Sequence, residues 1–330
     1  MEIKECLETL ASGRNLSYEQ SKQVFKQLFT GKLSGAQSGA LLMGLRAKGE
    51  TEDEIVGAVE IALSEAKTIS GLSGPLIDTC GTGGDGKHSF NCSTAVALFL
   101  ADLGFKVVKH GNRAVSSKCG SADVVEALGF PLVQDEEDVR RELEQKNFVF
   151  LFAPYFHPAF AHVVPVRKEL GIRTMFNLMG PLLNPAHPTH QLIGVPNEAI
   201  LELVARVLSR KNIEKGAVVL GAGGFDELTP CGVNKLFLVE PGQVTPMELN
   251  PKDFGFDLVE EKELVCADKE EALSKQKQVL RGEGPLALQS MVALNFGLIL
   301  HLVQGQELKS CFAMARDKVK QGITNLPILF

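Results

Sequence analysis

The sequence is poor in aromatic residues and has no tryptophan. Tyr18 and Tyr155 are its only tyrosines, so stacking on nucleic-acid bases would depend on phenylalanine alone. The formal net charge is −6, whereas nucleic-acid-binding proteins usually carry an excess of lysine and arginine. We therefore expect no nucleic-acid partner.

Cysteine is present but follows no pattern. The seven cysteines are scattered and no CxxC pair occurs, which argues against a disulfide framework and a structural zinc site. Free thiols are typical of a reducing compartment. The first residues, MEIKECLETL, are charged and amphipathic and lack the apolar core of a signal peptide. These features predict a cytoplasmic protein.

The sequence also lacks a long apolar run. We find no run of about 18 apolar residues, and Asp102 interrupts the best candidate. The 45% hydrophobic and 22% charged residues are instead typical of a globular protein with a sizeable core. We expect no membrane association, and 330 residues are enough for two domains.

The local patterns change near residue 72. Before it, apolar residues recur at helical spacing, and Ser17 with Gln20 and Thr51 with Glu54 resemble capping boxes. After the Gly- and Ser-rich stretch 70–75, short apolar strands alternate with helices. The sequence predicts an α/β protein with a small all-helical domain, 1–72, and a larger domain, 73–330, with a central, largely parallel sheet. The helical surfaces pack either within the chain or against another subunit.

The stretch from Asp78 to Thr94 predicts a strand, a glycine-rich turn and the start of a helix. Its glycines let the main chain approach a ligand closely, and N–H groups in such a turn and at the helix start attract an oxyanion. A tight, capped turn without a ligand is the alternative. A dinucleotide is not favoured, because the next strand ends in Lys109-His110 instead of an acidic residue.

A second polar stretch, Lys109 to Asp123, follows the next predicted strand. It gathers cations and hydroxyls around Gly111 and Gly120, which suits a ligand with several phosphates. Two such loops at the ends of neighbouring strands would form a crevice. A solvated surface loop is the alternative.

Four stretches together resemble the anthranilate phosphoribosyltransferase family. They are GTGGDGKHSFNCST, KHGNRAVSSKCGSAD, the stretch from His157 to Pro185, and GGFDEL from Gly223 to Leu228. Gly282 to Pro285 and Asn295 also fit, so the resemblance covers nearly the whole chain.

The resemblance implies a reaction, a fold and an assembly. The reaction is the Mg²⁺-dependent transfer of the phosphoribosyl group of phosphoribosyl pyrophosphate (PRPP) to the amine of anthranilate, in tryptophan biosynthesis. Two magnesium ions per subunit are implied. The fold is a small helical domain plus an α/β domain, with residues of about 160–184 returning to the helical domain. The resemblance also implies homodimers formed through the helical domain, and leaves association with an anthranilate synthase component open.

By the same resemblance, motif positions carry over to three sets of residues, with no general acid or base among them. The residues implied for PRPP are Gly81, Gly84, Asp85, Ser89, Asn91, Cys92, Ser93, Thr94, Lys109, His110, Gly111, Asn112, Arg113, Ala114, Val115, Ser116, Ser117 and Ser121. Those implied for anthranilate are Gly81, Asn112, Arg167, His110, His157 and Pro181. Those implied for magnesium are Ser93, Asp226 and Glu227, of which the carboxylates are oxygen ligands that Mg²⁺ prefers.

Each assignment has a plainer alternative. Asp226 and Glu227 fit a surface turn, Arg167 fits a helix-face ion pair, and Asp85 fits a brace for its own loop. The sequence also departs from the family at Gly223-Gly224-Phe225, where many members have Asp-Gly-Leu. These differences lie beside the metal motif and leave the proposed ligands Asp226 and Glu227 intact.

Two other functions stay open at this stage. One is a pyrimidine-nucleoside phosphorylase-like enzyme, whose fold and glycine-rich loops are related. The other is a non-catalytic nucleic-acid-binding relative. The stretch VRKELGIRTMFNLMGPLLNP and the acidic pair favour the transferase over the first, and the intact GTGGD and KHGNR motifs oppose the second.

Overall fold

The structure is a computed structural model that describes residues 2–87, 89–113 and 120–330. The chain forms two compact units. The helical unit comprises the chain up to Ser70 together with Ala153–Pro185, and the α/β unit comprises Gly71–Phe152 and Ala186–Phe330. The returning segment begins at Ala153, several residues before the expected position near 160, because α8 and the 3-10 helix after it already pack in the helical unit.

The helical unit is built from short helices in two stretches of the chain. The first stretch supplies α1 (Ile3–Ala11), α2 (Tyr18–Phe29), α3 (Gly35–Lys48) and α4 (Glu52–Ser64). The second supplies α8 (Ala153–Phe156), η1 (Pro158–His162), α9 (Val164–Leu170), α10 (Phe176–Met179) and η2 (Gly180–Leu183).

Capping side chains decide where the first helices begin. Ser17 Oγ accepts a hydrogen bond from the Gln20 N–H at 3.3 Å, and Gln20 Oε1 accepts one from the Ser17 N–H at 2.9 Å, so the predicted box is confirmed. At Thr51 only half of the box forms: the Thr51 N–H donates to the Glu54 carboxylate at 2.8 Å, and the Thr51 hydroxyl does not take part. Glu54 is buried and also accepts from Lys48 Nζ at 2.9 Å, which joins this cap to a larger polar network.

An aromatic cluster joins the two stretches of the helical unit. The ring of Phe29 on α2 stacks on Phe160 of η1 with centroids 5.3 Å apart. Phe176 on α10 meets Phe25 and Phe29 edge to face, at 6.4 and 5.9 Å. Aromatic side chains bury a large apolar area, so this cluster explains why residues far apart in the sequence share one core.

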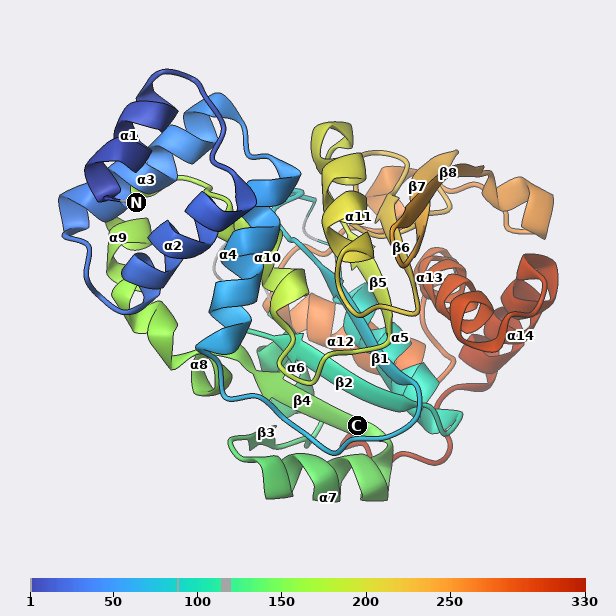
Figure 1. Ribbon diagram of the computed structural model, residues 1–330. Coiled ribbons are helices and arrows are strands. Elements are labelled where there is room, and N and C mark those ends of the chain that lie inside the picture. Colours follow the sequence, from blue (N-terminus) through green and yellow to red (C-terminus); the bar gives the residue numbers. More distant parts are fainter. Residues whose placement is uncertain (1, 88, 114–119) are drawn as a thin grey trace. The chain divides into compact units, whose positions relative to one another are not determined.

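The α/β unit is organised around an eight-stranded sheet (Figure 1). The strand order is β3-β4-β2-β1-β5-β6-β7-β8, with parallel pairing from β3 to β6 and antiparallel pairing of β7 and β8. The predicted fold class is therefore confirmed. The strands are β1 (Leu76–Gly81), β2 (Lys106–Gly111), β3 (Leu132–Val133), β4 (Phe148–Phe152), β5 (His190–Gly194), β6 (Lys215–Leu220), β7 (Asn234–Glu240) and β8 (Gln243–Leu249).

Helices cover the sheet because its strands are apolar on both faces. Alternate strand residues such as Val107, Phe148 and Ala217 join one large core cluster with α5 (Cys92–Asp102) and α13 (Leu286–Gln304). Residues of the other parity, such as Val108 and Val218, are also fully buried but lie outside that cluster. The other helical elements of this unit are α6 (Ser121–Ala127), α7 (Glu136–Lys146), η3 (Glu198–Ile200), α11 (Leu201–Ser209), η4 (Pro251–Phe254), η5 (Glu261–Glu263), α12 (Lys269–Leu280) and α14 (Leu308–Gln321).

The central strand β5 was not predicted from the sequence. It begins with two polar residues, His190 and Gln191, yet all five of its residues are buried between β1 and β6. Pairing with two neighbours satisfies its backbone, so tertiary context outweighs the weak local signal.

The most apolar long helix among the described residues is α13, and not the stretch that Asp102 interrupts. Leu286–Gln304 is long and apolar enough to cross a membrane by length and composition, with a mean hydropathy of 1.8 in its best window. Of that window, 72% is buried among other parts of the protein, as in the core helix of a globular protein. Polar residues such as Asn295 interrupt this stretch, so the sequence pattern did not reveal its high mean hydropathy.

Candidate metal and phosphate site

The two glycine-rich stretches follow neighbouring strands. β1 pairs in parallel with β2 on one side and with β5 on the other, so their carboxyl ends meet at one edge of the sheet. The Thr82 N–H donates to the Gly194 carbonyl at 2.9 Å, which extends the pairing beyond β1. In parallel sheets this edge is where ligands bind, as the sequence predicted.

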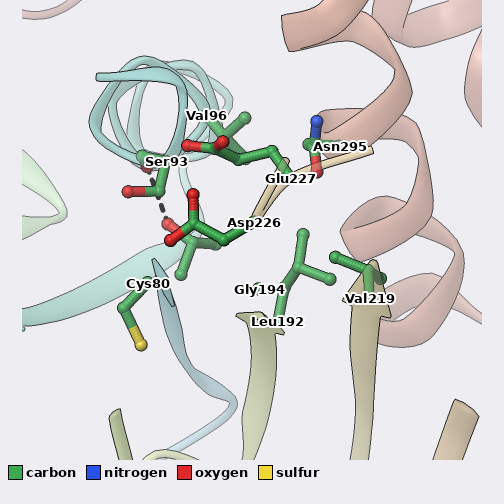
Figure 2. A pocket seen from close by; sticks show the side chains of 10 residues that line it. Cys80, Ser93, Val96, Leu192, Gly194, Val219, Asp226, Glu227 and Asn295 are labelled. Carbon is green, nitrogen blue, oxygen red and sulfur yellow. Dashed lines mark hydrogen bonds between the residues drawn. The ribbon is translucent and has the colours of Figure 1, made fainter. Parts of the chain in front are cut away.

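Three carboxylates gather at this edge. Asp85, Asp226 and Glu227 each offer an oxygen, and these oxygens lie within 4.8 Å of one another. The Gly83 N–H donates to Asp226 Oδ2 at 2.9 Å, which links the glycine-rich loop directly to the acidic pair. Figure 2 shows Asp226 and Glu227 beside Ser93 in a small cavity that is also lined by Thr79 and Asn295. A surface turn is therefore excluded for the acidic pair.

The acidic pair lies at this edge of the sheet because the backbone of its turn packs closely against two glycines. A Cβ on Gly194 would lie 1.4 Å from the Asp226 carbonyl oxygen, and one on Gly221 would lie 2.0 Å from that of Glu227. Asn295 of α13 fixes the next residue, since its Oδ1 accepts from the Leu228 N–H at 2.9 Å and its Nδ2 donates to the Leu228 carbonyl at 2.8 Å. Sequence reasoning assigned no role to Gly194 and missed how Asn295 acts. A polar residue within the apolar run of α13 was the available signal.

Burial makes this cluster electrostatically unfavourable without a cation. Burial raises the pKa of Asp226 to about 6, and the charge of Asp85 contributes. Burial also raises the pKa of Glu227 well above its ordinary value, with Asp226 and Asp85 adding to the effect. Asp85 Oδ2 and Glu227 Oε2 are buried and have no hydrogen-bond partner among the residues that the structure describes. Oxygen donors with unbalanced negative charge fit a divalent cation such as Mg²⁺.

Ser93 lines the same cavity, but its hydroxyl is engaged within the protein. Ser93 Oγ donates to Asn91 Oδ1 at 3.3 Å and accepts from Lys109 Nζ at 3.1 Å. Lys109 is fully buried and also donates to the Thr79 carbonyl at 2.5 Å. Burial lowers the pKa of Lys109. Its ammonium therefore braces β1 against the start of α5 in this structure, and contact with PRPP stays a prediction.

The start of α5 is occupied by its own hydrogen bonds. Asn91 caps the helix, because its Oδ1 accepts from the Thr94 N–H at 3.1 Å. Cys92 and Thr94 are fully buried, and the Cys92 N–H donates to the Phe90 carbonyl at 2.9 Å. Thr94 Oγ1 is buried and has no hydrogen-bond partner among the residues that the structure describes, and contact of Cys92 and Thr94 with PRPP stays a prediction.

The second polar loop is described only at its two ends. Arg113 forms a double hydrogen bond with the Glu126 carboxylate, at 2.6 and 3.0 Å, on the surface. A Cβ on Gly111 would lie 2.4 Å from Ser121 Oγ, which donates to the Asn112 carbonyl at 3.4 Å. These contacts bring β2 and the start of α6 together. The predictions for Ala114, Val115, Ser116 and Ser117 lie outside the described residues.

The remaining predicted PRPP residues sit in the first loop or at the end of β2. Gly84 has a φ of +76°, which favours glycine, and Ser89 forms an antiparallel bridge with Val265. Gly81 lies against the acidic pair, since a Cβ there would meet Asp226 Oδ2 at 2.2 Å. His110 is buried at the end of β2.

The residues predicted for anthranilate are divided between the two units. Gly81, His110 and Asn112 lie in the α/β unit, whereas Arg167, His157 and Pro181 lie in the helical unit. Within the described part of the chain no carboxylate pairs with Arg167. Its guanidinium lies over the Phe176 ring, 5.3 Å from the centroid, and donates to Asn177 Oδ1 at 3.5 Å. This excludes the helix-face ion pair that the sequence left open.

His157 is held as a neutral ring by a hydrogen bond to the Leu183 carbonyl. Its Nε2 lies 2.9 Å from the Leu183 carbonyl oxygen, and Nε2 must be the donor because a carbonyl only accepts. Burial lowers the pKa of His157 to about 4, so the imidazole is uncharged at neutral pH. An aromatic, uncharged ring suits the wall of a pocket for an aromatic ligand.

Two family models match the two parts of this chain. The model described as the glycosyl transferase family, helical bundle domain, matches residues 4–66, and the one described as the glycosyl transferase family, a/b domain, matches residues 73–325. The chain therefore belongs to the glycosyl transferase family.

Comparison with individual proteins points to a narrower family within this class. The anthranilate phosphoribosyltransferase of Nitratidesulfovibrio vulgaris is 50% identical over 322 residues, which are 96% of this chain and 95% of the relative. The crystal structure of the enzyme of the same name from Thermus thermophilus has a TM-score of 0.87 at 37% identity and covers 96% of this chain and 95% of its own. That from Saccharomyces cerevisiae in complex with PRPP and Mg has a TM-score of 0.86 at 25% identity, with 96% and 93% covered.

The chain belongs to the anthranilate phosphoribosyltransferase family. The resemblance that the motifs predicted is thereby confirmed. The phosphorylase-like and nucleic-acid-binding alternatives gain no support from these relatives.

Proposed function

We propose that the protein transfers the phosphoribosyl group of PRPP to the amine of anthranilate, giving N-(5-phosphoribosyl)anthranilate and pyrophosphate. The observation that carries this proposal is the cluster of the buried Asp226 with the half-buried Asp85 and Glu227 beside the glycine-rich loop. Its placement at the carboxyl edge of a parallel sheet suits a ligand that brings phosphates and magnesium together.

Magnesium is the proposed cofactor, with two ions per subunit. Asp226 and Glu227 would hold it, with Ser93 as the predicted hydroxyl ligand and Asp85 close enough to contribute. When bound, the metal would neutralise negative charge on the pyrophosphate that leaves. The Saccharomyces cerevisiae relative in complex with PRPP and Mg supports this choice of cofactor.

The chain's own groups would hold PRPP through its two loops. The glycine-rich loop after β1 and the polar loop after β2 would supply main-chain N–H groups, hydroxyls and cations, because each loop follows a strand at the same edge of the sheet. Such donors stabilise charge on a leaving pyrophosphate because they are in place before the reaction begins.

Arg167 is the proposed partner of the anthranilate carboxylate. Its planar guanidinium can form two parallel hydrogen bonds with a carboxylate, and Phe176 beneath it sets its plane. His157, Pro181, Gly81, His110 and Asn112 are the further proposed pocket residues. An aromatic amine is unprotonated near neutral pH, so attack at the anomeric carbon depends on positioning, and we assign no general acid or base.

The assembly and boundaries are also proposals. We propose a cytoplasmic homodimer that associates through the helical unit and has no nucleic-acid or membrane partner. The proposed domains are a helical domain, 1–72, joined by the returning segment Ala153–Pro185, and an α/β domain in the rest of 73–330. Exposed apolar side chains on the helical unit, Met43, Val164 and Ile172, support the dimer. A monomer in sedimentation at micromolar concentration would contradict it.

The function is tested by incubation with PRPP, Mg²⁺ and anthranilate while the fluorescence of anthranilate is followed. We expect the fluorescence to fall and pyrophosphate to appear in equal amount, and neither to occur without Mg²⁺. A parallel incubation with pyrimidine nucleosides and phosphate tests the phosphorylase. Base release there, with no loss of anthranilate, would overturn the proposal.

A further inference from the structure

Lys87 connects the two loops that carry the carboxylates. Its backbone N–H donates to Asp85 Oδ1 at 3.0 Å, inside the glycine-rich loop. Its ammonium lies over the ring of Phe225, 5.2 Å from the centroid, and Phe225 directly precedes Asp226. A cation over an aromatic face is attracted to it, so one side chain bridges residues that are far apart in the sequence.

Glu261 holds the Lys87 ammonium from a third segment. Glu261 Oε2 lies 2.9 Å from Lys87 Nζ, and the two side chains are 51% and 30% exposed. The same carboxylate lies against Gly223, where a Cβ would meet Glu261 Oε1 at 2.6 Å. Gly223 has a φ of +84°, so glycine is favoured there for both space and backbone geometry. This is the position at which the sequence departs from many family members.

The segment that carries Glu261 is itself fixed. Val265 forms an antiparallel bridge with Ser89, and its carbonyl accepts a hydrogen bond from Lys275 Nζ of α12 at 3.1 Å. The pair Lys87–Glu261 therefore does not join two loose loops. It ties the glycine-rich loop to a segment anchored on a helix.

The carboxylates need such a connection because they repel one another. Asp85 stands on one loop and Asp226 and Glu227 on another, and all three are negative when a cation is to be bound. The direct link described above is the hydrogen bond from the Gly83 N–H to Asp226. A cationic side chain that reaches from one loop to the other opposes their separation.

We propose that Lys87 is a positioning residue, which together with Phe225 and Glu261 holds the Asp85 loop against the Asp226–Glu227 loop so that a divalent cation meets three carboxylates. This inference rests on the proposed metal site. The role of Lys87, Phe225 and Glu261 is to position the carboxylate ligands, and none of the three contacts the reacting atoms.

The test measures cation binding directly, with Mn²⁺ followed by its electron paramagnetic resonance signal. Lys87→Met should weaken Mn²⁺ binding about three- to tenfold, the range expected for a part-exposed ion pair plus a cation–π contact. Lys87→Arg should restore binding, because it keeps the charge and stacks on the ring. Lys262→Met is the matched control, since Lys262 lies on the same segment and, among the described residues, pairs with exposed Glu260 at 2.6 Å. This variant should bind Mn²⁺ like the wild type.

The Mg²⁺ dependence of turnover and a second variant, Glu261→Gln, test the role of Lys87 independently. We expect Lys87→Met to raise the Mg²⁺ concentration for half-maximal turnover by a similar factor, with kcat at saturating Mg²⁺ nearly kept. Glu261→Gln should do the same, and the double variant should cost less than the sum of the two. Equal Mn²⁺ binding by wild type, Lys87→Met and Glu261→Gln would overturn the proposal. If the wild type does not convert anthranilate at all, the proposed function fails, while the Mn²⁺ titration still decides the role of Lys87.

Discussion

The proposed reaction depends mostly on individual carboxylates, and their environment makes turnover sensitive to their substitution. Asp226→Asn combined with Glu227→Gln removes the ligand charge from the buried acidic pair. We expect turnover to fall by about 100-fold or more at ordinary Mg²⁺, in line with losing a transition-state charge stabiliser, and to recover in part at high Mg²⁺. A magnesium titration of initial rates checks this, and a titration identical to that of the wild type would exclude the pair as ligands.

The raised pKa values of the same pair predict a pH dependence. The pKa of Asp226 is raised to about 6, mainly by burial, and burial raises the pKa of Glu227 well above its ordinary value. Without metal, the protonated forms are favoured in the folded state, so their stability contribution is present at low pH and is lost as pH rises through about 6. A metal binds the deprotonated forms.

Mn²⁺ affinity should therefore rise as pH increases through about 6, and binding should release protons. Calorimetry in buffers of different ionisation enthalpy measures the released protons. Affinity that stays constant across this range would contradict the assignment, and the Asp226→Asn variant should show a weaker pH dependence.

Arg167 is predicted to affect the binding of anthranilate and not that of PRPP. Removing a bidentate charged contact costs roughly 2–5 kcal/mol, so Arg167→Ala should raise the KM for anthranilate steeply. PRPP binding should stay nearly unchanged, because it depends on the two loops of the α/β unit. Lysine should restore activity only in part, since it cannot present the planar fork. Steady-state kinetics with each substrate varied, and calorimetry for PRPP, measure both effects; lost PRPP affinity with an unchanged anthranilate KM would refute the division.

At the scale of elements, the end of β5 decides where the acidic pair lies. A methyl group at Gly194 would overlap the Asp226 carbonyl, 1.4 Å away, so Gly194→Ala must displace the turn between β6 and β7. We expect a loss of about 1–3 kcal/mol of stability and weaker Mn²⁺ binding. Gly35→Ala is the control, because nothing lies within 4 Å of that position and it should leave both properties unchanged.

Equilibrium denaturation and the Mn²⁺ titration measure the two effects of Gly194→Ala. Stability and Mn²⁺ affinity equal to those of the Gly35→Ala control would show that the turn tolerates the extra group. The approach of two backbones at this point would then not control the site.

Local patterns predicted many of these elements. Short strands alternate with helices after residue 75, as the apolar pattern indicated, and the Ser17 cap formed as expected. The box at Thr51 formed only in part: the Glu54 carboxylate accepts from the Thr51 N–H and also from the Leu16 N–H at 2.8 Å, but the Thr51 hydroxyl takes no part. A local motif cannot report a second donor that comes from elsewhere in the chain.

For the whole molecule, Asp102 secures the carboxyl-terminal segment of the α/β unit. Its buried carboxylate accepts from Lys318 Nζ at 2.5 Å and from the N–H groups of Thr324, Asn325 and Leu326. Burial opposes the charge of Asp102, but these donors outweigh it and lower the pKa. Its stabilisation is therefore present above the unfolded pKa and is lost as pH falls through the folded pKa.

Asp102→Ala should reduce the free energy of unfolding by roughly 3–5 kcal/mol, because it leaves the Lys318 ammonium buried without its partner. Urea denaturation of the variant and the wild type measures this loss. Asp317→Asn, at an exposed position of α14, is the control and should change little. A loss for Asp102→Ala no larger than for the control would show that the carboxyl-terminal segment is held by apolar contacts alone.

The sequence by itself determined the class of this protein, because its evidence is local. Glycines in a turn, a capping serine or a run of strand-forming residues act on neighbours within a few positions, and the four motifs lie intact in the chain. The tertiary structure alone decided that Asp85 joins the acidic pair, that Asn295 fixes Leu228 and that Lys87 meets Glu261. These contacts join residues from separate elements, and the energy of such a contact depends on burial and distance, which exist only once the sheet and its helices have packed.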